Sequence, residues 1–310
     1  MRLTRVAIAI GMVAALLLSS AHAITDTEKT VSARKPSISI EDVDRFYRVY
    51  DAAMGHPSAD ELQRNYIDTG SEGLLQFAKR RNISGVSIAH NIASHPEMYS
   101  NARRCVPVLP RVRQRLEVDL RELRDLYPES KFPPVTIAVG HGKPVGVGSP
   151  VSGVQIGLEA LSAVKWYNPD LEDRFVHVIA HEYVHVQQVP ALVDDAHPTV
   201  LEASLIEGAA DFIGELVSGG IAYSYPNGME AKEPEAAFVS DEDKTDLSTW
   251  LYNSTMDKQG DLGYWIGYRI VKSFYQRAHD KRDAIRQILQ MSDPRALVAK
   301  SGWYPGIRLR

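Results

Sequence analysis

Cysteine is almost absent from this chain of 310 residues, in which Cys105 is the single example. A disulfide within the chain is therefore impossible, and stability must come from a packed core and from any bound metal. Hydrophobic residues make up 44% of the sequence, enough for a chain of this length to bury a large core. We interpret Cys105 as a small buried apolar residue and not as a catalytic nucleophile.

The chain also lacks an apolar run long enough for a membrane span near its start. The run at residues 6–18 has about thirteen residues, whereas a span needs about twenty. Arg2 and Arg5 precede this run, and Ala21-His22-Ala23 follows it with small residues at the spacing typical of a cleavage site. The sequence predicts a signal peptide over residues 1–23 and an exported protein, periplasmic or secreted, without a stable membrane anchor after cleavage.

There is no excess of basic residues. The formal net charge is −4, and removal of Arg2 and Arg5 with residues 1–23 changes it by −2, to −6. Such a chain, without a long run of one sign, is not expected to bind nucleic acid. We interpret the basic cluster Lys79-Arg80-Arg81 as the solvated end of a helix, where cations complement the helix dipole.

The pattern of apolar residues and breakers predicts an α+β fold, mostly helical, with a small sheet. A polar linker is expected over 24–36, a helical N-terminal region over 37–130 and a second domain over 131–310. In the first region we expect a helix starting around Ser39 and Asp42, then helices near 59–67, 71–82, 85–100 and 107–127. Strands are expected at 135–139, 144–147 and 154–158.

What the chain does have is His181-Glu182-Tyr183-Val184-His185, inside an apolar segment that predicts a buried helix over 171–188. Two histidines four residues apart project from one helix face and can bind one Zn²⁺ ion. Glu182 lies about 100° around the helix from His181, close enough to act as general base. The alternative is a pair of core histidines bonded to backbone or carboxylates.

A catalytic zinc site needs a third protein ligand. The metzincin continuation is absent, because Gln188 and Ala191 stand where it needs glycine and histidine. A second helix is expected from Thr199 to the Gly219-Gly220 stop, and it carries two glutamates. Glu202 has the spacing of a capping box with Thr199, which leaves Glu207 as the predicted ligand.

Asp211 lies one turn beyond Glu207, where it could accept a hydrogen bond from a zinc-binding histidine. Small residues at 203 and 208–210 would let this helix approach the helix over 171–188 closely. An ordinary tightly packed helix pair would carry the same small residues.

HExxH followed by about twenty residues and ExxxD resembles the gluzincin zinc metallopeptidases. HEYVH with Glu207-Gly-Ala-Ala-Asp211 is more narrowly similar to a bacterial family of predicted zinc-dependent proteases of unknown function, over roughly residues 130–305. The resemblance implies a zincin-like fold with its small sheet before the HExxH helix. It also implies zinc on His181, His185 and Glu207, Glu182 as base and Asp211 as orienting carboxylate.

Several further residues are candidates around such a site. Tyr264 and Tyr268 lie one turn apart and could donate to the oxyanion, and we favour Tyr264. We interpret His177 as a surface residue, with support of a zinc ligand as the alternative. His141 lies in a glycine-rich turn, and the minor alternative is that it faces the substrate. By analogy with zinc peptidases, 153–158 is the strand candidate for substrate pairing, and 223–255, with Pro226-Asn227-Gly228, could form a cleft wall or lid.

The sequence therefore predicts an exported zinc peptidase that acts on peptides or proteins. Zinc would activate a water molecule, Glu182 would carry its proton to the leaving amine, and Tyr264 would stabilise the oxyanion. One alternative is a zinc hydrolase of another amide, such as a cell-wall amide. Another is a non-catalytic exported binding module, against which Glu182 argues because a structural zinc needs no base.

Overall fold

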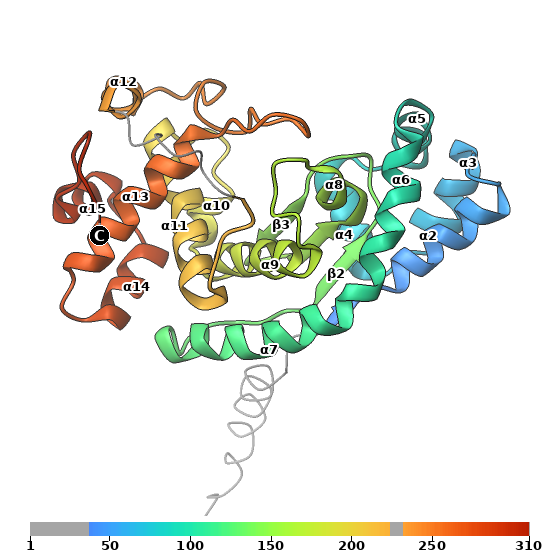
Figure 1. Ribbon diagram of the computed structural model, residues 1–310, viewed down its shortest axis with the longest axis horizontal. Helices are drawn as coiled ribbons and strands as arrows, with labels where there is room; N and C mark the ends of the chain where they lie inside the picture. Colours follow the sequence, from blue (N-terminus) through green and yellow to red (C-terminus); the bar gives the residue numbers. More distant parts are fainter. Residues whose placement is uncertain (1–36, 224–231, 310) are drawn as a thin grey trace, which may run out of the picture. The chain divides into compact units, whose positions relative to one another are not determined.

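The computed structural model describes residues 37–223 and 232–309, which all belong to one compact unit (Figure 1). The expected signal peptide (1–23), the linker (24–36) and Pro226-Asn227-Gly228 lie outside the described residues. Within the described ranges, no helix combines the length and apolar character that a membrane crossing requires.

A four-stranded sheet forms in the order β1-β2-β4-β3. Its strands are β1 (Ile38–Ser39), β2 (Val135–Ala138), β3 (Gly146–Ser149) and β4 (Gly153–Gly157). β2 pairs in parallel with β1 and β4, and β3 pairs antiparallel with β4. The three expected strands are confirmed, but the choice of 153–158 as the substrate-pairing strand is wrong. β4 is bonded on both sides, and the edge strand beside it in the described part of the chain is β3.

β1 was not predicted, because a two-residue strand has no periodicity to recognise. Ser39 was expected to start a helix, but it pairs with Thr136 in the sheet. The first helix begins instead at Glu41, after Ile40, which makes no side-chain capping bond. Asp42 is buried and accepts hydrogen bonds from the backbone and hydroxyl of Ser71.

The helices of the first part are α2 (Glu41–Ala52), α3 (Ala59–Leu62), α4 (Glu72–Arg81), α5 (Gly85–Ser94), α6 (Pro96–Ala102) and α7 (Leu109–Leu126), with a π-helical segment at Gln63–Ile67 and a 3-10 segment at Arg103–Val108. One expected helix, 85–100, is divided because Pro96 disfavours helical backbone at His95. The helices of the second part are α8 (Leu158–Ala163), α9 (Leu171–Gln187), α10 (Pro190–Val193), α11 (Val200–Ser218), α12 (Lys232–Asp241), α13 (Leu262–Arg277), α14 (Lys281–Leu289) and α15 (Pro294–Ser301). The mostly helical α+β prediction is confirmed.

The elements stack in a sequence that buries α9 and α11. α9 packs on β3 and β4, α11 packs on α9, and α13 packs on α11, with α14 and α15 beyond it (Figure 1). α2 and α4 cover the opposite sheet face, where Gly73 of α4 contacts Thr136. Because α9 and α11 lack a solvent-facing stripe over most of their length, polar residues on their facing sides require partners within the protein.

The entrance to β3 is fixed by a buried carboxylate. Glu159 of α8 accepts hydrogen bonds from the backbone N–H groups of Gly140 and Gly142, each at 2.9 Å. Its side chain is fully buried, and burial raises its pKa while the two N–H groups act in the opposite direction. Glu159 thereby holds the turn that leads from β2 to the edge strand.

α11 and α13 cross with their backbones in contact. A Cβ atom at Gly267 would lie 1.7 Å from the carbonyl oxygen of Ser204, and one at Gly208 would lie 2.1 Å from the carbonyl carbon of Gly267. We expected Gly208 to allow the approach to α9, and this is wrong. The glycine of α11 that faces α9 is Gly214, where a Cβ atom would lie 3.3 Å from the nitrogen of His181.

Replacing Gly267 with alanine tests this crossing. In an open helix, Gly→Ala stabilises by about 1 kcal/mol, whereas overpacking costs about 1–3 kcal/mol. We expect Gly267→Ala to lower the free energy of unfolding measured in urea. An increase would mean that the two backbones do not touch at this point.

Candidate metal centre

α9 presents the HEYVH residues at a fixed place in the stack. Asp170 caps the helix by accepting a hydrogen bond from the N–H of Asp173, and the helix ends at Gln187, before Pro190. On its sheet side, the Tyr183 hydroxyl donates to the carbonyl of Pro133 at 2.7 Å. With Tyr183 held on this side, His181 and His185 of α9 face α11.

α11 begins with the predicted capping box. The hydroxyl of Thr199 accepts from the N–H of Glu202 at 3.2 Å, and the Glu202 carboxylate accepts from the N–H of Thr199 at 2.7 Å. This prediction is confirmed. Glu202 is consequently engaged at the helix start, and Glu207 is the glutamate of α11 that faces the two histidines.

His181, His185 and Glu207 form a three-ligand cluster. The two Nε2 atoms are 3.1 Å apart, and Oε2 of Glu207 lies 3.4 Å from that of His181 and 3.2 Å from that of His185. Donors bound tetrahedrally to zinc at about 2.0–2.2 Å are separated by about 3.3–3.6 Å. The donor types and their separations therefore fit one Zn²⁺ ion, and among the described residues this cluster could hold a metal ion.

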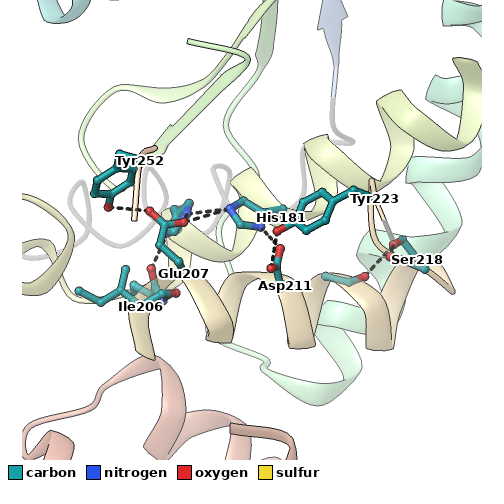
Figure 2. Close-up of polar contacts among 11 residues, drawn as sticks. His181, Ile206, Glu207, Asp211, Ser218, Tyr223 and Tyr252 are labelled. Atoms are coloured by element: carbon teal, nitrogen blue, oxygen red, sulfur yellow. Dashed lines mark hydrogen bonds and ion pairs between the residues drawn. The ribbon is translucent and has the colours of Figure 1, made fainter. Parts of the chain in front are cut away.

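The other nitrogen of each imidazole is held by a hydrogen bond. Nδ1 of His181 donates to Oδ1 of Asp211 at 2.8 Å (Figure 2). Nδ1 of His185 donates to Oε1 of Gln188 at 2.7 Å. The amide of Gln188 in turn donates to the carbonyl of Ile206 at 2.9 Å, which fixes its orientation. Both Nε2 lone pairs consequently point into the cluster, as a metal site requires.

Two tyrosines hold the carboxylates of this cluster. The Tyr252 hydroxyl donates to Oε1 of Glu207 at 2.9 Å, and the Tyr223 hydroxyl donates to Oδ2 of Asp211 at 2.6 Å (Figure 2). In both Glu207 and Asp211, the carboxylate oxygen that the tyrosine does not bind faces a histidine. Sequence reasoning placed both residues in a segment expected to form a wall or lid, but it assigned neither of them a role.

The charges of the cluster support one another. Burial would raise the pKa of Glu207, but His185 and His181 hold that pKa well below its usual range. Burial would lower the pKa of His181, and its hydrogen bonds to Asp211 and Glu207 more than offset this and raise the pKa. Glu207 is thus an ionised carboxylate, the form that binds a cation.

Glu182 lies between the ligand cluster and the edge strand. A Cβ atom at Gly146 of β3 would lie 2.3 Å from its Oε1, and one at Gly148 would lie 2.0 Å from its backbone carbonyl oxygen. The carboxylate is buried, and burial raises its pKa while His181 and His185 act in the opposite direction. Only glycine on β3 leaves room for this carboxylate beside the strand.

A cavity of about 580 Å³ opens over the cluster. Its wall contains residues 144–148 at the edge strand, the ligand side of α9 and α11, and Tyr223, Leu247 and Tyr252 from the segment expected to form a wall. The end of α4 also contributes, through Arg80 and Arg81. From the sequence we interpreted Lys79-Arg80-Arg81 only as a solvated helix end and missed the contribution of Arg80 and Arg81 to the cavity.

The structure separates the two oxyanion candidates. Tyr264 lines the cavity and lies nearly parallel to the ring of His181, with centroids 6.4 Å apart. Burial raises its pKa well above the ordinary value, so its hydroxyl remains a donor. Tyr268 points elsewhere, because its hydroxyl donates to Glu215 at 2.5 Å and its ring stacks on Trp265.

The other two histidines considered as candidates, His177 and His141, make contacts within the protein. His177 is buried, and its Nδ1 lies 2.9 Å from the hydroxyl of Ser218, so the surface interpretation is wrong. His141 donates from Nε2 to the carbonyl of Arg81 at 3.2 Å, so its hydrogen bond goes to the end of α4. Cys105 is buried with a free thiol, as predicted.

A His-His-Glu cluster on two packed helices, beside a carboxylate and under a cavity, has the donor set and the access that a zinc site requires. Residues 164–293 match the model of a family described as "Predicted Zn-dependent protease (DUF2268)". This confirms the resemblance over α9 to α14, a narrower range than the expected 130–305. Comparisons with curated proteins and with solved structures find no match.

Two glutamates on α11 provide a matched test of the zinc site. We expect Glu207→Ala to lose most of the zinc measured per chain by elemental analysis, because it removes one of three ligands. Glu202→Ala should keep one zinc and lose only the cap, worth about 0.5–2 kcal/mol of stability. Full zinc retention in a folded Glu207→Ala variant would exclude Glu207 as an essential ligand.

Proposed function

We propose that this protein is an exported zinc peptidase of the gluzincin type, with zinc held by His181, His185 and Glu207. The observation that carries the proposal is the place of Glu182, a buried carboxylate between the ligand cluster and a free strand edge. A purely structural zinc has no use for such a carboxylate. Export rests on the sequence signal at residues 1–23, and the peptidase class is supported by the family match.

Zinc, when bound, would polarise the scissile carbonyl and make water a better nucleophile near neutral pH. Glu182 accepts the proton of the attacking water and returns it to the leaving amine. Asp211 and Gln188 each accept a hydrogen bond from Nδ1, which leaves Nε2 of each histidine as the atom that would bind the metal. Tyr252 restrains Glu207, so the ligand carboxylate keeps its orientation during turnover.

The edge strand supplies a way to bind an extended peptide. Among the described residues, β3 is paired on one side only, so its other side can pair with a substrate strand. Gly146 lies directly beside Glu182, which would bring a peptide bond on this edge close to the general base. A peptide substrate therefore fits this site through backbone pairing, which a substrate without an extended peptide backbone could not use.

Glu182→Gln separates metal binding from catalysis. We expect the variant to retain one zinc per chain, because the carboxylate is not a ligand, and to lose about 10²–10⁴-fold in kcat for peptide hydrolysis. The assay is a quenched fluorescent peptide library on the zinc-loaded protein. Unchanged peptide turnover by a pure preparation would remove Glu182 from the mechanism.

Tyr264→Phe tests the oxyanion donor, with Tyr268→Phe as its matched control on the same helix. Loss of one such donor typically costs about 10²–10³-fold in kcat. We expect that loss for Tyr264→Phe with little change in KM, and nearly full activity for Tyr268→Phe. Equal effects of the two substitutions would assign Tyr264 a packing role against His181.

A further inference from the structure

The cavity over the metal centre includes two consecutive cations, Arg80 and Arg81, at the end of α4. They lie outside residues 164–293, so the family match assigns them nothing. The carboxylates at the metal centre have other neighbours: Glu207 faces the two histidines, and Asp211 is bonded to His181 and Tyr223. The guanidinium groups of Arg80 and Arg81 must therefore pair with other groups or remain unpaired.

Arg80 has a partner in the protein. Its guanidinium lies 2.9 Å from Oδ1 of Asp194, which follows α10. This ion pair joins α4 to the segment between α10 and α11, which also lines the cavity. Arg80 is thus engaged in holding two parts of the wall together.

Arg81 differs from its neighbour. Its side chain is exposed, and among the described residues no acidic group lies within ion-pair distance of it. Its backbone is nonetheless fixed, because its carbonyl accepts a hydrogen bond from His141 and because Asn82 ends the helix in a left-handed conformation (φ 52°). The guanidinium therefore projects from an anchored point on the wall.

Arg81 lines the same cavity as Glu182 and Tyr252, so its guanidinium borders the space above the metal centre. A guanidinium in this position presents planar, paired donors that match a carboxylate. Peptides offer carboxylates in only two ways, as acidic side chains and as the C-terminus.

We propose that Arg81 forms a subsite for a carboxylate of the substrate, next to the scissile bond. The inference rests on the proposed peptidase function and adds its substrate preference. The ligand is an acidic side chain or a terminal carboxylate at one fixed position relative to the cleaved bond. The subsite is supplied by α4, on a different part of the chain from the zinc ligands.

The test compares peptides that differ only in charge. Internally quenched peptides carry Glu or Gln at each position around the cleaved bond, each with either a free or an amidated C-terminus. We expect a carboxylate at one position to raise kcat/KM about 5–10-fold in the wild type. Dependence on the fixed Glu identifies a side chain, and dependence on the free terminus identifies the α-carboxylate.

Three variants assign the preference to one residue. Arg81→Gln should bring the charged-to-neutral ratio to about one, and Arg81→Glu should invert it. Lys79→Gln removes the same charge from the same helix turn but lies outside the cavity lining, and should leave the ratio unchanged. Equal loss in Lys79→Gln would reduce the effect to general surface charge and overturn the subsite.

A binding assay keeps the two proposals distinguishable. Fluorescein-labelled peptide pools fixed as Glu or Gln, amidated and with a free terminus, are titrated into Glu182→Gln and Glu182→Gln/Arg81→Gln proteins by anisotropy. Tighter binding of the carboxylate pools that is lost with Arg81 supports the subsite, even if the wild type cleaves no peptide and the peptidase proposal fails. Peptide cleavage without any charge preference, in turnover and in binding, would overturn the subsite and leave the peptidase proposal intact.

Discussion

The packing of α9 against α11 is the constraint on which the site depends. It places two imidazoles and a carboxylate in one buried cluster, with Nε2 atoms 3.1 Å apart. Two lone pairs at that separation repel each other unless a proton or a metal ion lies between them. A core of this kind is costly without a metal, and the same desolvation that makes it costly strengthens metal binding. We therefore expect folding and zinc binding to be coupled in this protein.

The surrounding hydrogen bonds fix the orientation of the candidate metal ligands. Asp211 and Gln188 each fix one histidine, and Tyr223 and Tyr252 each hold the far oxygen of a carboxylate. Removing such a partner leaves a ligand in place but free to rotate, which typically costs about 10–100-fold in metal affinity or activity. Glu182, the proposed general base, is oriented differently, by steric contact with Gly146 of the edge strand.

Features that depend on residues close together in the sequence could be predicted. The HEYVH spacing, the Thr199 capping box and the glycine stop at Gly219 each act within one helix. Contacts between distant segments could not be predicted, because no periodicity encodes them. Tyr252 bonds to Glu207, which lies 45 residues before it in the sequence. The position of β3 beside β4 at the sheet edge depends on strand pairing, which the alternation of apolar and polar residues does not specify. The role of Arg81 in the cavity was missed for the same reason.

Locating the metal tests the proposed zinc site most directly. Crystals of the mature protein loaded with zinc, measured on both sides of the zinc absorption edge, give the position of the ion by anomalous scattering. We predict one strong peak between Nε2 of His181, Nε2 of His185 and Oε2 of Glu207, at about 2.0–2.2 Å from each. A peak elsewhere, or none at this cluster in a zinc-loaded crystal, would contradict the proposed zinc site.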